Sequence, residues 1–261
     1  MSATENKVEF SAVDASSDLR TFDFALVIPM ANEEPDFSSF IDALRQTLNY
    51  LKCGTVYFVV DGVSKDKTLE LCQRLSADDK RFVTVWAPEN KNVVDAYMRG
   101  YREAVKKHDF IIEMDAGLSH DPRAIPMFLR VLNEGNECAF GSRFINGGSI
   151  WQSSFKRTFL SRTGTVLSNI LLGTKMRDMT SGFQGFHSNI VEEFLKYPLR
   201  SKAHFYQTEL RYLLRHKRYI EVPIHYRAPS PSVSSKAIRN SISVLWYYFL
   251  QRLTGSSHSI D

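Results

Sequence analysis

Apolar and polar positions along residues 24–140 follow a repeating order of strand and helix. Continuous short apolar runs predict buried strands at Phe24–Pro29, Thr55–Val60, Phe82–Trp86, Phe110–Met114 and Cys138–Phe140. Apolar residues at helical spacing predict helices between them at Asp36–Leu51, Asp66–Leu75, Val93–Lys107 and Pro122–Asn133. Continuously apolar strands that take turns with helices are typical of a mostly parallel sheet covered on both faces. The pattern therefore predicts an α/β fold.

The last third of the chain has a different pattern, rich in arginine, serine and aromatic residues. It contains two amphipathic segments, Phe155–Leu172 and Lys236–Leu253, whose apolar faces have basic edges. Such helices fit a membrane interface, and they also fit packing against a protein core. Neither segment reaches the roughly 20 apolar residues that a spanning helix needs. Packing against a core is the commoner explanation for any one such helix. For this chain we expect peripheral attachment to a membrane surface or a membrane partner, and no spanning segment.

Composition narrows the class of protein. The chain has 261 residues, 43% of them hydrophobic, and a net charge of +4, which excludes a disordered, collagen-like or coiled-coil chain. The charge is too diffuse to indicate a nucleic-acid partner. Three widely spaced cysteines and an N-terminus without an apolar signal segment predict a reducing, cytoplasmic location. The two amphipathic segments add the expectation of peripheral attachment to the cytoplasmic membrane face.

Polar residues follow three of the predicted strands at once, at the end where ligands of parallel sheets bind. Asp115 follows the fourth strand. Its carboxylate suits Mg²⁺ or Mn²⁺ if phosphates and water complete the shell, and it equally suits a helix cap. Asp61, after the second strand, fits a nucleobase N–H or a turn. Glu33, after the first, fits a ribose or base contact or a cap. Ser64 and Asp66 fit capping better.

Cations and hydroxyl groups gather in the last third. Arg143 and Arg162 lie among small residues, and guanidinium groups suit forked contacts with phosphate. Residues 178–183 (DMTSGF) have neither helical nor strand period, which fits a substrate loop or a tight turn. Glu209 stands among apolar residues at helical spacing, either as a general base or as an exposed ion-pair partner of Arg211 or Arg215. The chain has no GxGxxG or GxxxxGK[ST] motif, which excludes a classical dinucleotide site and a P-loop.

Seven short motifs occur in one order: VIPMANE (27–33), VVDGVSKDKT (59–68), MDAGLSHDP (114–122), GSRF (141–144), Gly147-Gly148 with Trp151, Ser161-Arg162, and DMTSGF (178–183). Together they resemble glycosyltransferase family 2, most closely its dolichyl-phosphate mannose synthase-like branch, over roughly residues 24–226. The resemblance implies a GT-A fold, with a mostly parallel nucleotide-sugar-binding sheet flanked by helices, and C-terminal amphipathic helices. It also implies inverting transfer from a nucleotide-diphosphate sugar, with Mg²⁺ or Mn²⁺ as cofactor.

The resemblance also suggests roles for individual residues. Catalysis is implied for Asp115, Arg143 and Glu209, and Asp115 is also the implied metal ligand. The implied contacts of the donor nucleotide sugar are Pro29, Asn32, Glu33, Asp61, Ala116 and Gly117. The implied contacts of the acceptor, or of a substrate phosphate, are Arg162, Thr180, Ser181, Gln207 and Lys236.

Three positions depart from the pattern of that family. Gly117 replaces the usual second acid of the metal motif, Gly62 replaces the second of two aspartates after the second strand, and Ala31 replaces an aromatic residue. Loss of one acid removes a metal ligand and about one negative charge beside the diphosphate, so we expect weaker metal affinity and more reliance on arginine and lysine.

We therefore expect an enzyme that transfers a hexose from a GDP- or UDP-linked donor to a lipid acceptor, with polyprenyl phosphate favoured. A phosphate acceptor needs no general base, whereas a saccharide hydroxyl needs one, for which Glu209 is the candidate. A non-catalytic nucleotide-sugar-binding subunit is the other alternative, because of Gly117. The expected organisation is a polar leader (1–23), a GT-A catalytic domain (24–230), and an amphipathic helix and tail (231–261).

Overall fold

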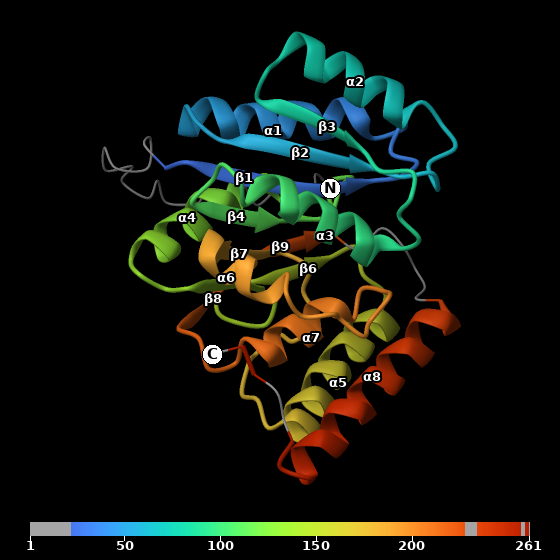
Figure 1. The fold of residues 1–261 in the computed structure, drawn as a ribbon, viewed down its shortest axis with the longest axis vertical. Coiled ribbons are helices and arrows are strands. Elements are labelled where there is room, and N and C mark those ends of the chain that lie inside the picture. Colours follow the sequence, from blue (N-terminus) through green and yellow to red (C-terminus); the bar gives the residue numbers. More distant parts are fainter. Residues whose placement is uncertain (1–21, 228–233, 257–258, 261) are drawn as a thin grey trace, which may run out of the picture.

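The computed structural model describes residues 22–227, 234–256 and 259–260 (Figure 1). Strand and helix take turns through the first half of the chain, as the apolar pattern predicts. The elements of this half are β1 (Phe24–Met30), α1 (Phe37–Leu51), β2 (Thr55–Val60), α2 (Thr68–Asp78), β3 (Phe82–Trp86), α3 (Val93–Ala104), β4 (Phe110–Glu113), the short 3₁₀ helix η2 (Pro122–Ala124), α4 (Ile125–Asn133) and β5 (Cys138–Ser142).

The second half of the chain adds elements that the pattern only partly predicts. The amphipathic segments form α5 (Phe155–Leu172) and α8 (Ser235–Leu253), close to their expected bounds. Short strands and helices that sequence reasoning missed lie between them. The remaining elements are β6 (Ser149–Trp151), β7 (Gln184–His187), α6 (Ser188–Phe194), α7 (Tyr206–Leu213), β8 (Tyr219–Pro223) and β9 (His225–Arg227).

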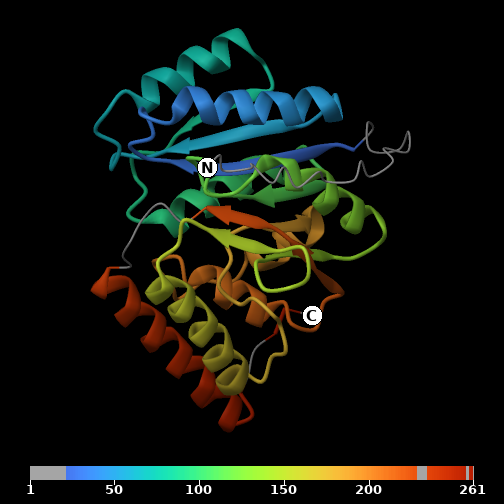
Figure 2. The ribbon, with the colours of Figure 1, turned by 180° about the vertical axis from the view of Figure 1, so that it is seen from behind.

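The main sheet has seven strands in the order β3-β2-β1-β4-β7-β5-β8. All neighbouring pairs are parallel except those made by β7, which runs antiparallel to both β4 and β5. The prediction of a mostly parallel sheet is therefore confirmed. A separate pair, β6 and β9, forms a small parallel ribbon. Helices cover both faces of the main sheet (Figures 1 and 2).

Two hydrophobic cores form because successive strand residues point to opposite faces. Val27 and Ile111 pack with α3, α6 and α7 on one face, whereas Leu26 and Ile112 pack with α1 and α4 on the other. Burial on both faces explains why these strands are continuously apolar. Because β1, β2 and β4 run parallel, their carboxyl ends meet at one edge of the sheet, where the candidate site lies.

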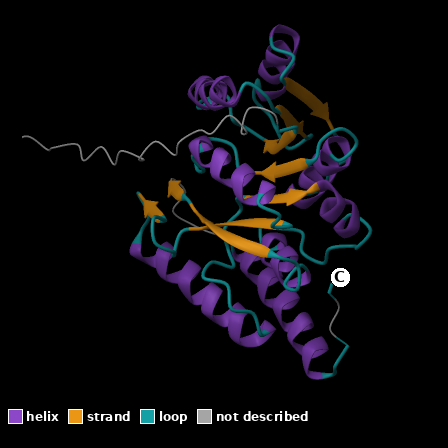
Figure 3. Cartoon of the chain, turned by 90° about the vertical axis from the view of Figure 1, so that its left-hand side faces the viewer, coloured by secondary structure: helices purple, strands orange, loops and turns teal. Residues whose placement is uncertain are grey.

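Helices α5 and α8 lie side by side below the sheet (Figures 1 and 3). Their C-terminal ends meet where Arg252 donates hydrogen bonds to the Ile170 and Leu171 carbonyls, at 3.2 and 3.1 Å. Much of their apolar surface remains uncovered. The exposed large apolar residues of the two helices are Phe155, Phe159, Leu160, Val166, Leu167, Ile170, Ile238, Ile242, Trp246, Leu250 and Leu253. Across the described residues, no helix combines the length and apolar character needed to cross a membrane.

Candidate functional site

The loops after β1 and β2 are joined by hydrogen bonds. Asn32, which has a positive φ of 58°, donates its backbone N–H to Ser64 Oγ at 3.1 Å. Its side-chain oxygen accepts the backbone N–H of Lys65 at 2.8 Å. The Asp66 carboxylate accepts the Thr68 N–H at 3.0 Å, at the start of α2, in a turn typical of aspartate. Ser64 and Asp66 therefore act in loop structure, as predicted.

Two acidic residues line the edge of the sheet beside these joined loops. Asp61 is buried, and its Oδ1 accepts the Val63 N–H at 2.9 Å, so its carboxylate is held by its own turn. Glu33 is half-buried, and its N–H donates to Thr68 Oγ1 at 2.8 Å. Burial and the neighbouring carboxylates of Asp36 and Asp115 raise the pKa of the Glu33 carboxyl to about 7.

Asp115 follows β4 and is held from two sides. The hydroxyl of Tyr97 on α3 donates to Asp115 Oδ1 at 2.8 Å, and the Asp115 backbone N–H donates to His120 Nδ1 at 3.0 Å. Burial lowers the pKa of His120, which agrees with a neutral ring whose Nδ1 accepts a hydrogen bond. The Asp115 side chain keeps 29% of its surface exposed, so it can reach a ligand.

Gly117, two residues after Asp115, adopts a left-handed conformation with φ of 71°. A Cβ at this position would stand 3.0 Å from Glu33 Oε2. The space that a second motif acid would use is therefore next to the Glu33 carboxylate. Ala116, between the two, is half-buried against the core that contains α1 and α4, and Pro29 pairs with Val59 inside the sheet.

Arg143 forms a buried ion pair after β5. Its guanidinium donates to both carboxylate oxygens of Asp178, at 2.7 and 2.8 Å, and to Thr180 Oγ1 at 2.6 Å. Although burial acts in the opposite direction, the Arg143 guanidinium lowers the pKa of the Asp178 carboxyl to about 2. The DMTSGF segment is thus a structured loop organised by this ion pair. Most of the N–H groups of the Arg143 guanidinium donate to other residues of the protein.

Aromatic rings connect Arg143 with the other candidate cations. The guanidinium of Arg143 lies 5.2 Å from the Phe144 ring centroid, and that of Arg162 lies 5.0 Å from the same centroid. Arg162 is exposed and makes no ion pair with the described residues. The rings of His120 and Tyr226 are 5.1 Å apart, and Arg143 also lies over Tyr226. His120 therefore lies between Asp115, whose backbone N–H it accepts, and the arginine side of the site, by which we mean Arg143 and Arg162.

Gln207 on α7 carries an unused donor beside the DMTSGF loop. Its side chain is 3% exposed, and its Nε2 has no hydrogen-bond partner among the described residues. It lies so close to the backbone of Gly182 that a Cβ there would collide with the amide. Ser181, next to Gly182, is also buried and accepts the Phe183 N–H at 3.4 Å. A buried amide donor without a partner is uncommon, but this nitrogen has almost no exposed surface, so its contact with a substrate stays a prediction.

Two predicted residues, Glu209 and Lys236, make no hydrogen bond or ion pair with the other candidate residues among those that the structure describes. Both carboxylate oxygens of Glu209 accept hydrogen bonds, from the N–H groups of Arg200 and Ser201 at 2.8 Å each and from the Tyr248 hydroxyl at 2.7 Å. None of these partners contacts Asp115 or Arg143, so the base role of Glu209 stays a prediction. Lys236 is exposed in the first turn of α8.

Sequence reasoning missed a buried polar network beneath the site. Glu113 on β4 is fully buried and accepts hydrogen bonds from the hydroxyls of Tyr101 and Tyr206 and from Gln184 Nε2. Burial raises the pKa of the Glu113 carboxyl to about 7. The fully buried Arg211 connects Gln184 with the Asp178 carbonyl. An acid inside an apolar strand was the signal available in the sequence, because a buried charge requires partners.

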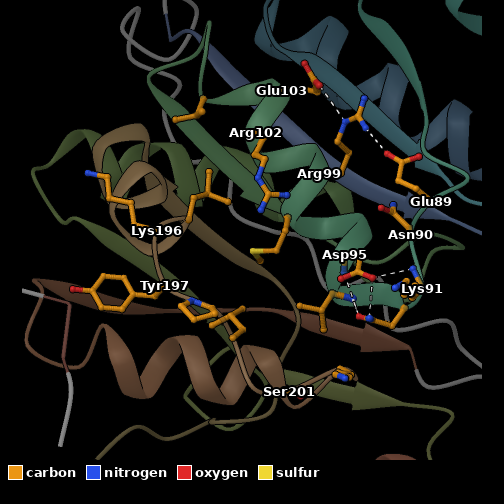
Figure 4. Close-up of a pocket in the computed structure, with 18 of the residues that line it drawn as sticks. Glu89, Asn90, Lys91, Asp95, Arg99, Arg102, Glu103, Lys196, Tyr197 and Ser201 are labelled. Carbon is orange, nitrogen blue, oxygen red and sulfur yellow. Dashed lines mark hydrogen bonds and ion pairs between the residues drawn. The ribbon is translucent and has the colours of Figure 1, made fainter.

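A groove of about 1060 Å³ lies apart from this site, between α3 and residues 195–202 (Figure 4). Arg99 on its wall pairs with Glu89 and Glu103, at 2.7 and 3.1 Å. None of the predicted site residues lines it. Polar residues of α3 face the groove, whereas Tyr97 of the same helix is buried on the side of Asp115. The groove and the predicted site residues therefore lie in different parts of the molecule.

Comparison with known proteins gives the family context. Residues 25–195 match the model described as "Glycosyl transferase family 2". The chain is 26% identical over 220 residues to a polyprenol monophosphomannose synthase of Mycolicibacterium smegmatis, covering 82% of this chain and 81% of that one. It is 30% identical over 208 residues to a dolichol-phosphate mannosyltransferase of Pyrococcus furiosus, covering 77% of this chain and 56% of that one.

Solved structures support the fold independently. A glucosyl-3-phosphoglycerate synthase of Mycobacterium tuberculosis, in complex with Mn²⁺, UDP and glucosyl-3-phosphoglycerate, superimposes with a TM-score of 0.64 at 17% identity. The match covers 90% of this chain and 81% of that chain. At this identity the likeness bears on the fold alone, and it confirms the expected GT-A architecture.

Proposed function

Because this chain belongs to glycosyl transferase family 2, we propose that it transfers a hexose from a nucleotide-diphosphate sugar to a polyprenyl phosphate. The chain is a glycosyltransferase by family, and its relatives include enzymes named for mannosyl transfer to polyprenol, dolichol and undecaprenyl phosphates. Mannose is therefore the first sugar to test. The observation that carries the proposal is that His120 contacts both groups of charged residues. It accepts the Asp115 backbone N–H, beside the Glu33 carboxylate, and its ring packs on Tyr226, which lies under Arg143.

The donor nucleotide is proposed to bind at the joined loops after β1 and β2. Asp61 and Asn32 lie where a base and ribose would approach the sheet edge, and the diphosphate would lie toward Asp115. Mg²⁺ or Mn²⁺ suits this corner, because the carboxylates of Asp115 and Glu33 are hard oxygen donors close to each other. The bound ion would neutralise the leaving diphosphate. Among the described residues no group of three ligating acids, histidines or cysteines forms, so phosphate and water oxygens would complete its shell.

The acceptor is proposed to approach from the arginine side. Arg162 is exposed and lacks an acidic partner among the described residues, so it suits the oxygens of an incoming phosphate. The buried Gln207 amide would reach that phosphate only if the neighbouring DMTSGF loop moved. The Asp178 carboxylate offsets the positive charge of Arg143. Arg143 would therefore contribute little to attracting this phosphate and more to orienting it. An anionic phosphate oxygen attacks the anomeric carbon, the bond from that carbon to the diphosphate oxygen breaks, and configuration inverts. This nucleophile needs no general base, which agrees with a Glu209 engaged in three hydrogen bonds.

A membrane surface is the proposed source of the lipid acceptor. The uncovered apolar residues of α5 and α8 lie on two neighbouring helices, and Arg239 and Lys236 of α8 are exposed as well. The N-terminal half of α5 also carries Arg157 and Arg162, whose guanidinium groups reach Tyr226 and Phe144 of the site. A lipid phosphate held at these helices would therefore lie near the arginine side. Peripheral binding to the cytoplasmic leaflet is part of this proposal.

The test is transfer of labelled hexose from GDP-mannose, UDP-glucose and related donors to polyprenyl phosphate or to free saccharides. Asp115→Asn should lower the rate by roughly 100-fold or more, because neutralisation of a leaving diphosphate is worth several kcal/mol. Asp121→Asn is the matched control, since Asp121 lies in the same loop but pairs with the exposed Arg123. Transfer to saccharide hydroxyls alone would replace the proposed acceptor class. Binding of donor without turnover for any acceptor would favour the non-catalytic alternative.

A further inference from the structure

Tyr97 is a buried side chain next to the proposed metal site, and the proposed function gives it no role. It lies on α3 with 1% of its surface exposed, and its hydroxyl donates to Asp115 Oδ1 at 2.8 Å. The backbone N–H of Asp115 is fixed separately by His120. The other carboxylate oxygen, Oδ2, accepts no hydrogen bond from the described residues. Tyr97 therefore satisfies one oxygen of Asp115 and leaves the second for a ligand.

The position of Tyr97 is itself firmly determined. Asn92 caps α3 by accepting the Val94 and Asp95 N–H groups at 2.9 and 3.3 Å. One turn after Tyr97, Gly100 lies against Val27 of β1 so closely that a Cβ there would collide with that side chain. The ring of Tyr97 also packs on Tyr206, with centroids 5.1 Å apart. The cap, the close helix–strand contact and the aromatic packing together fix the hydroxyl beside Asp115.

We infer that Tyr97 is a positioning residue that holds the Asp115 carboxylate in its ligand-binding orientation. The inference rests on the proposed metal and diphosphate site. A motif with two acids can bind an ion even when one of them rotates. With Gly117 in the second position, this chain has one motif acid, so the orientation of Asp115 matters more. Partners that orient a ligating carboxylate typically contribute roughly 10- to 100-fold to metal affinity or activity.

A purely structural role for Tyr97 is the competing explanation, because buried hydroxyls normally have a partner whatever their function. The chain provides a matched control in Tyr101. It lies four residues later on the same helix and is equally buried, but its hydroxyl donates to Glu113 and not to Asp115. Removal of either hydroxyl makes the same chemical change in the same core. Only Tyr97→Phe should alter the site.

The test titrates Mn²⁺ into wild type, Tyr97→Phe and Tyr101→Phe in the presence of GDP or UDP, with free Mn²⁺ followed by electron paramagnetic resonance. We expect Tyr97→Phe to weaken Mn²⁺ binding roughly 10-fold or more and Tyr101→Phe to leave it within twofold. Thermal unfolding confirms that each variant folds. In an Asp115→Asn background, Tyr97→Phe should have no further effect on Mn²⁺ binding. Equal effects of the two tyrosine variants would overturn the inference.

A second measurement separates this inference from the proposed function. Crystal structures of the same variants report the orientation of Asp115 without any metal. We expect the carboxylate to rotate or to occupy several rotamers in Tyr97→Phe, and to stay fixed in Tyr101→Phe. If wild type binds no Mn²⁺, the metal part of the proposed function fails, and these structures still decide the role of Tyr97. An Asp115 carboxylate that does not move in Tyr97→Phe would overturn it.

Discussion

The carboxylate of Glu33 lies directly against the backbone of Gly117. A Cβ on Gly117 would stand 3.0 Å from Glu33 Oε2, and the φ of this glycine is 71°. The position at which the family resemblance implies a second motif acid is therefore crowded and left-handed here. A carboxylate from the β1 loop reaches the same corner instead, which gives a physical reason for the Asp-Ala-Gly sequence.

We predict that Gly117→Asp does not strengthen metal binding. The new side chain would adopt a left-handed backbone at a cost of about 1 kcal/mol and would place a second negative charge beside Glu33. A lower melting temperature and unchanged or weaker Mn²⁺ affinity are expected, measured by calorimetry and by Mn²⁺ titration. Gly117→Ala is the control for backbone strain without charge. Stronger Mn²⁺ binding in Gly117→Asp would show that Glu33 does not fill the corner.

We predict that Glu209→Gln lowers the free energy of unfolding and leaves the rate of transfer to a phosphate acceptor nearly unchanged. Its carboxylate accepts two backbone N–H groups and the Tyr248 hydroxyl, and an amide group would oppose one of these donors. The expected loss is about 1–3 kcal/mol in the free energy of unfolding, measured by urea denaturation. Transfer to a phosphate acceptor by the folded variant should change little. A collapse of turnover with stability unchanged would restore Glu209 as a general base.

The Asp178–Arg143 pair predicts a specific loss of stability in acid. The pKa of Asp178 is about 2 in the folded protein and 3.8 as its ordinary value. The unfolded chain therefore takes up a proton first as pH falls. The stability contributed by this pair is fully present above about pH 4 and is lost as pH falls through about 2. The difference corresponds to about 2 kcal/mol.

The check is the free energy of unfolding of wild type and Asp178→Asn between pH 7 and pH 2. The wild-type curve should fall more steeply below pH 4, and the variant should be less stable at neutral pH because its Arg143 is left buried and unpaired. Parallel curves for the two proteins would contradict the assigned pair. Asp121→Asn, at an exposed pair, serves as control.

We predict that the exposed apolar residues of α5 and α8 bind vesicles. Phe155 and Ile242 are 87% and 61% exposed, and burial of such side chains contributes about 1.5–3 kcal/mol each. The double variant Phe155→Glu, Ile242→Glu should lose at least 10-fold in binding to vesicles of phosphatidylcholine and phosphatidylglycerol, measured by co-sedimentation. Tyr50→Glu, at an exposed aromatic residue of α1, should bind as wild type does. Equal binding by all three proteins would exclude these residues.

The first half of the fold could be predicted from the sequence because its strands are buried on both faces. Val27 and Leu26 point to different cores, so the whole run is apolar and easily recognised. Strand β7 was missed because it has four residues and contains Gly185, which packs against Phe128 and Ile112. A short strand with a glycine carries almost no local signal, and its place is decided by its neighbours in the sheet.

The same distinction applies to the site. The places of Asp115 and Asp61 at the sheet edge could be predicted, because each follows a predicted strand of a mostly parallel sheet. The role of Tyr97 could not, because it depends on which helix crosses which strand. Glu113 carried a signal as an acid inside an apolar strand, but its partners could not be read from the sequence. In the sequence, Tyr97 is one more apolar residue on the inner face of a helix. Its hydroxyl acquires a function only from the contact with Asp115, which lies 18 residues away along the chain.

The antiparallel strand β7 also bears on how the chain folds during synthesis. It fills the position between β4 and β5, yet it is made only after α5 has been completed. Until residues 184–187 leave the ribosome, the main-chain groups of β4 and β5 on those sides lack their native partners. A nascent chain of about 180 residues should therefore be vulnerable to aggregation, and release of β7 should join β4 to β5 before β8 is added at the edge of the sheet.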